Sequence, residues 1–378
     1  RERYAIAAAK DGDTVELLTD ATVMERILLD GKNLTIDTNG CSVTYSGDAA
    51  NTQAIIDLYG NSEVTITGDG AFTIDDNYLE YNGIGYTFRI YGNSRLTIEN
   101  GTYYAGLTCV QAADNAIAYI EGGDFSASTD WNDVYWLLNL IDNSQAKFVV
   151  TGGSFENFDP AYSKTENPVA NFCAEGYIST STTDGKNTIY TVVALDEENS
   201  VAKVTGSGKT TYFETLPKAV AAAKDGETVT LLKKVDLTAS GLTIETGKDL
   251  TLDLNGKEIK VASTVNGRIL VNGHLTIEDS TDTDKDGTGT GKIYTETKYT
   301  DGATGYALLE ASGTKAELVI DSGLIDASSF TNNPTNEGQF AVGVEGGATV
   351  TVTGGKITAG WYAISGNGTD TAATSTVN

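Results

Sequence analysis

An internal duplication constrains this chain more than any other feature of its sequence. The segment AAAKDGDTV at 7–15 returns at 221–229 as AAAKDGETV, and GKNLTIDTNG at 31–40 returns at 247–256 as GKDLTLDLNG. Each copy joins an alanine-rich stretch suited to a short helix, a run suited to a β-strand and an Asn-Gly turn. Self-similarity of this kind indicates a repeated architecture, so we expect at least two copies of one module.

A shorter phrase, strand-like residues followed by a glycine turn, recurs through both halves of the chain. One apolar residue of each phrase serves as a register mark. In the first half the marks are 30, 32, 22 and 30 residues apart. In the second half they are 25, 43 and 32 residues apart. The marks are Ile36, Ile66, Ile98, Ile120 and Val150, and then Leu252, Ile277, Ile320 and Val352.

Fixed phrases separated by variable insertions are typical of a solenoid, in which strands keep their register while loops vary. A step of 22 residues is too short for a βαβ unit. The expected fold is therefore all-β, with each step forming one coil of a parallel β-helix. Asn61, Asn93 and Asn272 occupy similar turn positions, where asparagine tolerates the left-handed conformation and bonds to neighbours in a stack.

The module boundaries follow from where the phrase changes. Short capping helices are expected over 3–10 and 216–224, packed on the ends of the stacks because such helices are marginal alone. The phrase breaks between 159 and 200, as expected of an altered terminal coil. We expect two tandem modules, 1–198 with this closing segment and 199–378, the second opening with a hairpin over 201–213. The second module lacks a closing segment, and the chain has no initiator Met or signal peptide. It is therefore interpreted as a C-terminally truncated fragment of a longer secreted protein.

Charge and composition exclude several classes of function. The net charge is −27 and the isoelectric point about 4.2, which disfavours nucleic acid as a partner because phosphate binding needs a basic face. No apolar run reaches the ~18 to 20 residues of a membrane span, so no membrane insertion is expected. Cys41, Cys109 and Cys173 form no Cys-x-x-Cys motif, so buried thiols are expected in place of a disulfide framework or a zinc site.

Several phrases resemble the pectate-lyase-like adhesive modules of large surface proteins from gut bacteria. They are AAAKDGDTVELL, GKNLTIDTNG, VTGGSFENFDP and NFCAEGY in the first half, and AAAKDGETVTLL and GKDLTLDLNG in the second. The resemblance spans nearly the whole chain and implies right-handed parallel β-helices on a bacterial cell surface. It supplies no catalytic residue. The expected function is thus adhesin-like, binding a host glycan or a host protein (an immunoglobulin is one possibility) through variable loops.

A carbohydrate-active enzyme, either a polysaccharide lyase or a hydrolase, is the alternative, because parallel β-helices also carry such sites. The single histidine, His274, lies in a turn phrase. Asp75 and Asp76 are adjacent and would point to opposite faces of a strand, whereas hydrolysis needs two carboxylates at a set separation. Arg89 and Arg95 could serve a lyase, but nothing in the sequence ties them to acids. We therefore expect no catalysis, and a passive stalk is the third possibility.

Ligand-binding residues are expected in the aromatic-rich insertions of the first module. Aromatic rings beside acidic side chains commonly hold a sugar or a protein hot spot. The alternative is that Trp136, Leu138 and Leu140 alternate into the core while Tyr135 packs on a loop. Other aromatic residues of these insertions are Tyr86, Tyr103 and Tyr104. The candidate ligand-binding residues are Trp131, Asp133, Tyr135, Tyr78 and Tyr81.

No cofactor is expected, with calcium as the one exception considered. Asp282, Asp284 and Asp286 in the segment DTDKDG at 282–287 resemble the first half of a calcium loop. The complete loop has a Glu six positions after its glycine, where this chain has Ile293. An acidic insertion between two strands is also expected at this place without any metal.

Overall fold

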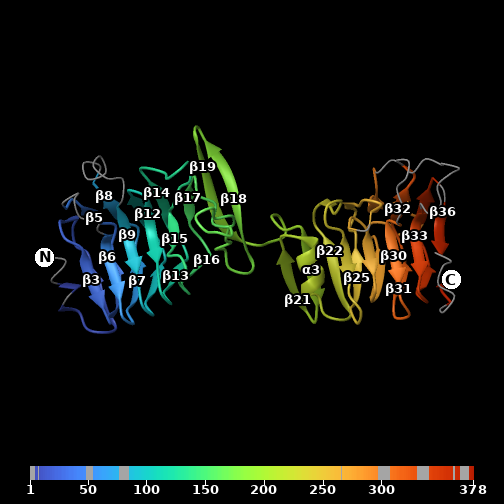
Figure 1. Cartoon of the computed structure of the whole chain (residues 1–378), viewed down its shortest axis with the longest axis horizontal. Coiled ribbons are helices and arrows are strands. Elements are labelled where there is room, and N and C mark those ends of the chain that lie inside the picture. Colours follow the sequence, from blue (N-terminus) through green and yellow to red (C-terminus); the bar gives the residue numbers. More distant parts are fainter. Residues whose placement is uncertain are drawn as a thin grey trace. The chain divides into compact units, whose positions relative to one another are not determined.

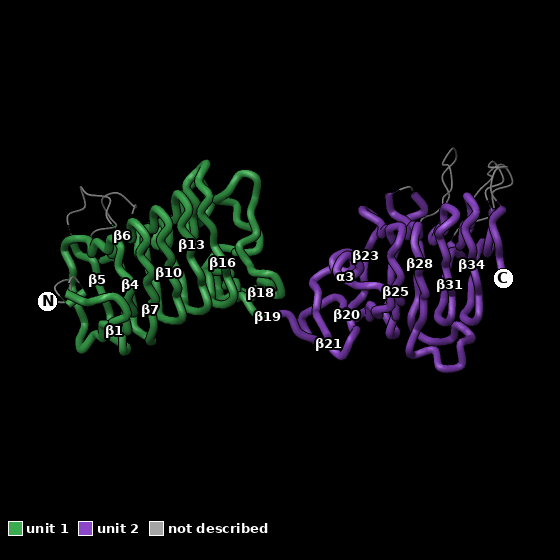
Figure 2. Tube along the Cα trace, turned by 90° about the horizontal axis from the view of Figure 1, so that it is seen from below, with its two compact units in different colours: residues 1–194 green, residues 195–378 purple. Residues whose placement is uncertain are grey.

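The structure is a computed structural model of the 378-residue chain. It describes residues 5–6, 8–47, 54–75, 85–264, 266–296, 307–329, 340–360, 362–366 and 374–378. The chain divides into two compact units, Arg1–Ala194 and Leu195–Asn378, which Figure 2 colours separately. The division lies four residues before the boundary that the sequence predicts between residues 198 and 199.

The first unit consists of three sheets, and successive strands between residues 13 and 156 enter the first, second and third sheet in turn (Figure 1). The first sheet contains β1 (Asp13–Glu16), β4 (Asn33–Asp37), β7 (Glu63–Thr67), β10 (Arg95–Ile98), β13 (Ile117–Ile120) and β16 (Lys147–Val150). The second contains β2 (Ala21–Val23), β5 (Ser42–Tyr45), β8 (Ala71–Ile74), β11 (Thr102–Ala105), β14 (Asp124–Ala127), β17 (Ser154–Glu156), β19 (Asn187–Ala194) and β18 (Tyr177–Asp184). The third contains β3 (Ile27–Asp30), β6 (Ala54–Tyr59), β9 (Tyr86–Ile90), β12 (Thr108–Ala112) and β15 (Leu138–Leu140).

The second unit repeats this arrangement. Its first sheet contains β21 (Lys209–Phe213), β20 (Ala202–Gly206), β22 (Glu227–Leu231), β25 (Asp249–Asp253), β28 (His274–Glu278), β31 (Glu317–Ile320), β34 (Thr349–Val352) and β37 (Thr376–Val377). The second contains β23 (Val235–Asp236), β26 (Glu258–Lys260), β29 (Lys292–Tyr294), β32 (Leu324–Ala327) and β35 (Lys356–Ala359). The third contains β24 (Leu242–Ile244), β27 (Ile269–Val271), β30 (Leu309–Ser312), β33 (Phe340–Glu345) and β36 (Tyr362–Gly366).

Nearly all strand pairs are parallel, and the predicted all-β class is confirmed. The antiparallel pairs lie on either side of the division between the units. At the end of the first unit the hairpin β18–β19 joins the second sheet through β17. At the start of the second unit the hairpin β20–β21, which the sequence predicted over 201–213, joins the first sheet through β22.

The predicted register marks are cross-strand partners, so the predicted register is confirmed. In the first unit Ile36, Ile66, Ile98, Ile120 and Val150 lie opposite one another on successive strands. In the second unit Leu252, Ile277, Ile320 and Val352 do the same. Insertions of different length between the marks therefore leave the pairing of the first sheet unchanged.

The two cores differ in chemistry although the sheets correspond. In the second sheet of the first unit, Phe72, Tyr103, Phe125 and Phe155 point inward on successive strands and their rings stack. Centroid separations are 5.9, 4.8 and 4.9 Å along this stack. Tyr86, Tyr103 and Tyr104 were expected in the insertions, and this is wrong because they lie in β9 and β11, with the Tyr103 side chain fully buried in the core.

In the second unit the corresponding inward positions are aliphatic. Ile259, Ile293 and Ile325 lie opposite one another on β26, β29 and β32, and all three are fully buried. β-Branched side chains suit such half-buried strands because their restricted rotamers pack well on a pleated surface.

Turns between the third and first sheets are held by asparagine side chains. The Asn93 amide donates to the Asn61 side-chain oxygen at 3.0 Å, and Asn115 donates to that of Asn93 at 3.2 Å. Gly92 in the same turn has a φ of 68°, and a Cβ there would lie 2.6 Å from the carbonyl oxygen of Gly60. Glycine is therefore needed for both the conformation and the close approach.

Helix α3 (Leu216–Ala222) covers the start of the second unit. The Thr215 side chain caps its N-terminus by accepting from the Lys218 amide, and Pro217 lies in its first turn. The Lys248 ammonium donates to the carbonyls of Ala221 and Ala223 at its C-terminus. In the first unit Lys32 likewise donates to the Ala9 carbonyl at 2.9 Å. The helix expected over 3–10 lies partly outside the described residues.

The longer connections of the first unit lie at one corner, and in the second unit the connection 279–291 between the first and second sheets is long as well. Connections from the first to the second sheet of the first unit are short, as in 38–41 and 68–70. Those from the second to the third sheet include 46–53, 75–85 and 128–137. In the second unit the same corner carries 261–268, 295–308 and 328–339. The candidate residues Trp131, Asp133 and Tyr135 all belong to a connection of this corner.

Candidate ligand-binding hollow

The connection 128–137 contains a tight two-residue turn. Trp131 and Val134 pair through their backbones, with N···O distances of 2.8 and 3.2 Å, around Asn132 and Asp133. Asn132 and Asp133 have φ values of 55° and 61°, a conformation that Asn and Asp adopt more readily than other side chains. The Asp133 amide also donates to the Asp130 carboxylate at 3.1 Å. This turn holds Trp131 and Asp133 at the surface.

A hollow of about 220 Å³ lies beside this turn. It is formed where three segments of the first unit meet: the connection 128–137, the segment 157–164 after β17, and the hairpin β18–β19. Its lining consists of Asp133, Val134, Tyr135, Asn157, Phe158, Asp159, Tyr162, Lys164 and Tyr190.

Phe158 and Asn157 connect the hollow to the core and to the hairpin. Phe158 is buried, with its ring 6.1 Å from that of Phe155 at the end of the aromatic stack. The Asn157 amide donates to the Thr188 carbonyl at 2.7 Å, and its side-chain oxygen accepts from the Thr188 amide at 2.9 Å. The hollow is therefore held by a rigid hairpin and a packed ring, which favours a preformed site.

The exposed polar groups of the hollow are of mixed charge. Two carboxylates, Asp133 and Asp159, lie with one ammonium group, that of Lys164. One Asp159 oxygen accepts from the Ala161 amide at 3.0 Å. Burial, followed by the charge of Asp159, raises the pKa of the nearby Cys173 thiol to about 12, so this thiol adds no charge at neutral pH.

The predicted ligand residues divide into three groups. Asp133 and Tyr135 line the hollow. Trp131 is 57% exposed but is not among the lining residues, so it lies on the same turn outside the hollow. Tyr78 and Tyr81 fall outside the described residues. Of the alternative packing, Leu138 is buried as expected, whereas Trp136 and Leu140 are only half-buried.

Sequence reasoning missed Tyr162, Lys164 and Tyr190. A usable signal was present, because the phrase FENFDP at 155–160 departs from the coil pattern exactly where the hollow forms. Tyr162 follows this break and is 57% exposed. Tyr190 comes from the later hairpin and pairs with Phe155 across the antiparallel ladder.

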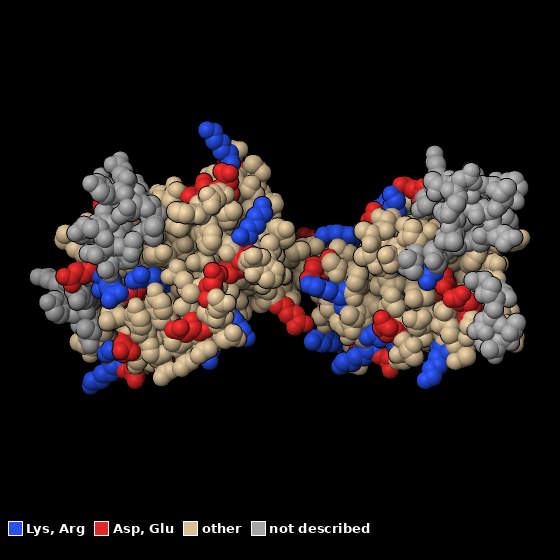
Figure 3. Space-filling model, in the orientation of Figure 1, with Lys and Arg blue, Asp and Glu red and all other residues tan. Residues whose placement is uncertain are grey.

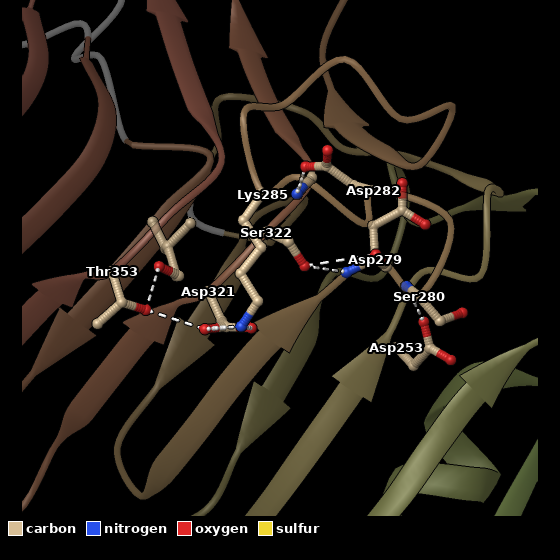
Figure 4. A network of polar contacts seen from close by, with 10 residues as sticks. Asp253, Asp279, Ser280, Asp282, Lys285, Asp321, Ser322 and Thr353 are labelled. Carbon is tan, nitrogen blue, oxygen red and sulfur yellow. Dashed lines mark hydrogen bonds and ion pairs between the residues drawn. The ribbon is translucent and has the colours of Figure 1, made fainter.

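Two of the three aspartates of the calcium-like segment accept hydrogen bonds from neighbouring protein groups, and Figure 4 shows the position of one of them, Asp282. The Asp282 carboxylate is buried and accepts from the amides of Gly287 and Gly323, both at 2.9 Å. These amide contacts lower the pKa of Asp282, with that from Gly323 first. Asp286 accepts from the Thr288 amide and hydroxyl, and Asp284 is exposed.

Ligation by these groups would compete with hydrogen bonds that already hold the loop. In the part of the chain that the structure describes, no three His, Cys, Asp or Glu residues are grouped so as to hold a metal ion. The calcium site stays a prediction. The hydrogen bonds of Asp282 explain the aspartate at this position without a metal.

The residues weighed for catalysis are dispersed. His274 begins β28 and does not lie in a turn, and its Nδ1 is 2.9 Å from an Asp249 oxygen on the neighbouring strand. Asp75 follows β8, and Asp76 lies outside the described residues. The expectation that no acid is tied to Arg89 is wrong, since its guanidinium binds the buried Asp57 carboxylate through both Nε and Nη2, at 2.8 and 2.7 Å.

Glu310 is an acidic group that the sequence analysis did not identify. It lies on β30 and forms an ion pair with Arg268, and both side chains are about nine-tenths buried. Burial raises the pKa of Glu310 to about 7, opposed by Arg268 and reinforced by a hydrogen bond with Glu345. Burial of this degree leaves little of the carboxyl group within reach of a substrate.

Charged side chains elsewhere on the surface are interspersed. On the face shown in Figure 3, acidic and basic residues alternate without a continuous basic area among the described residues. Among the described residues no helix is long and apolar enough to cross a bilayer. Comparison with protein-family models, with curated proteins and with solved structures finds no match.

Proposed function

We propose that this chain is a non-catalytic, adhesin-like segment of a secreted bacterial surface protein. It binds a host glycan or a host protein at the hollow of the first unit. The observation that carries the proposal is the convergence there of Asp133, Tyr135, Tyr162 and Tyr190 from three separate segments. Aromatic rings with a few fixed polar groups in a concave site are the usual composition of a binding site.

The proposal includes a right-handed parallel β-helix for each unit, as in the adhesive modules that the sequence resembles. Support comes from the rotation of successive strands through three parallel sheets and from the inward columns that each sheet contributes. Such a scaffold keeps its register while its connections vary, so binding residues on the connections can change without loss of the core.

A binding screen of the full chain tests this function. The chain is immobilised and exposed to host glycans and to secreted host proteins, immunoglobulins included. We expect at least one ligand whose affinity falls about tenfold or more in Tyr162→Ala, as for a central aromatic contact. Tyr362→Ala, at a half-exposed tyrosine of the second unit, is the matched control and should bind as the parent does. Absence of binding by a folded chain would instead support a passive stalk.

A carbohydrate-active enzyme is the second candidate, and the raised pKa of Glu310 favours it, although burial leaves little of this carboxyl group within reach of a substrate. A carboxyl group that keeps its proton near neutral pH beside a second carboxylate, here Glu345, can act as a general acid. Incubation with pectin-like and mucin-like polysaccharides, with and without calcium, tests this candidate. Chain cleavage that Glu310→Gln abolishes would support it, and inactivity of the folded chain under all conditions would reject it.

A further inference from the structure

We infer that the hollow binds one uncharged sugar residue at the end of a glycan chain. This inference rests on the proposed function and narrows its ligand class. Three properties of the hollow support it: its size, its charge and the uncommitted polar groups on its wall.

The size limits the ligand to about one ring. The hollow measures about 220 Å³, whereas sites that enclose drug-sized ligands measure roughly 300 to 1,000 Å³. An extended polysaccharide would need a longer groove. A single ring, with the rest of the glycan directed toward solvent past Trp131 or Lys164, fits these dimensions.

The charge disfavours acidic sugars. Asp133 and Asp159 contribute two negative charges against the single positive charge of Lys164, and the whole chain carries −27. A uronic or sialic acid would bring a third carboxylate to this site. A cationic ligand such as a quaternary ammonium is favoured by this net charge and by tyrosine rings, but a quaternary ammonium group offers no hydrogen-bond partner to the phenols or to Lys164.

The polar groups match the hydroxyl groups of a neutral sugar. Within the described chain, the side chains of Asp133, Tyr135, Tyr162, Lys164 and Tyr190 make no hydrogen bond or ion pair with protein groups. A sugar hydroxyl can donate to the carboxylate and accept from the ammonium or a phenol. The tyrosine faces can cover the apolar C–H face of the ring, which places both kinds of group in one small site.

Ligand-detected NMR titrations of the full chain test the inference. The probes are methyl glycosides of glucose, galactose, mannose and N-acetylglucosamine, then glucuronate, galacturonate, sialic acid and choline. We expect at least one neutral glycoside to bind, and its acidic counterpart of the same stereochemistry to bind about tenfold more weakly. Tyr162→Ala should lose the neutral sugar and Tyr162→Phe should largely retain it, because the ring face supplies most of the contact.

The outcomes separate this inference from the proposed function. Tighter binding of an acidic sugar or of choline, or binding only to glycans of three or more residues, would overturn the inference and leave the proposed function standing. Binding of a host protein alone, blocked by Tyr162→Ala, would do the same. Failure of every probe in the earlier screen and here would overturn both.

Discussion

Replacement of Phe125 by Ala should destabilise the first unit by about 4 kcal/mol. The side chain is 2% exposed and lies between Tyr103 and Phe155 in the core stack, with centroid separations of 4.8 and 4.9 Å. Truncating a buried Phe costs about 3–5 kcal/mol when the cavity stays open. The neighbouring rings belong to hydrogen-bonded strands about 4.8 Å apart, so they have little freedom to close the gap.

The ring contacts place this variant in the middle of that range and not at its lower end. Each stacked pair contributes about 0.5–1.5 kcal/mol beyond its buried area, and Phe125 takes part in two. Phe125→Leu keeps most of the apolar volume and loses only these contacts and some packing, so we expect a cost of about 1–2 kcal/mol.

Differential scanning calorimetry of the full chain measures the effect. For a unit of this size a loss of 4 kcal/mol lowers Tm by about 8 to 16 °C. Ile293→Ala, at the corresponding inward column of the second unit, should lower the other transition and leave the first in place. The reasoning is refuted if Phe125→Ala lowers Tm no more than Phe125→Leu does, because the stack would then not stabilise the unit.

Three further predictions concern the second unit. The pKa of Glu310 is raised to about 7 in the folded chain, whereas an unfolded Glu has a pKa of about 4.3. Between these two pH values Glu310 is therefore protonated in the folded chain and ionised in the unfolded chain. The stability of the second unit, measured by calorimetry, should therefore fall as the pH rises from about 4 to about 7. The slope of stability against pH should be smaller in Glu310→Gln. An unchanged slope would contradict the assignment. Lys248→Met should lower the free energy of unfolding by about 1 kcal/mol, measured by denaturant unfolding, because the carbonyls at the end of α3 lose a hydrogen-bond donor. An unchanged free energy of unfolding would show that Lys248 does not stabilise the helix end. Neither calcium nor a chelator should change the Tm of the parent chain, whereas Asp282→Asn should lower it because two amide hydrogen bonds are weakened. A rise in Tm on addition of calcium would instead support a metal site at this loop.

The sheets were more predictable from sequence than the hollow because strand register is encoded locally. Ile36, Ile66 and Ile98 each lie in the same short phrase, so their alignment requires no knowledge of distant residues. Tyr103 was misplaced for a different reason, because it was grouped by composition with the aromatic residues of the insertions, whereas it lies in β11. The Tyr103 ring is buried because Phe72 and Phe125 stack on it.

The hollow depends on contacts between segments far apart in the sequence. Asp133 and Tyr135 were identified from their local composition. Tyr162 lies in the segment after β17, and Tyr190 lies in the hairpin. The antiparallel pairing of β17 with β19 brings Tyr190 beside the 128–137 connection. The ion pair between Asp57 and Arg89 was missed for a related reason, because its partners are 32 residues apart on neighbouring strands.

The corner between the second and third sheets makes each unit a scaffold for grafting. Connections of very different length occur there, such as 106–107 and 128–137 in one unit, while the strands on both sides keep their pairing. Lengthening a flexible loop costs only about 0.6 kcal/mol for each doubling. Foreign peptide loops inserted at several levels of this corner would thus be displayed in a row at the spacing of the strands, as an array with a fixed pitch.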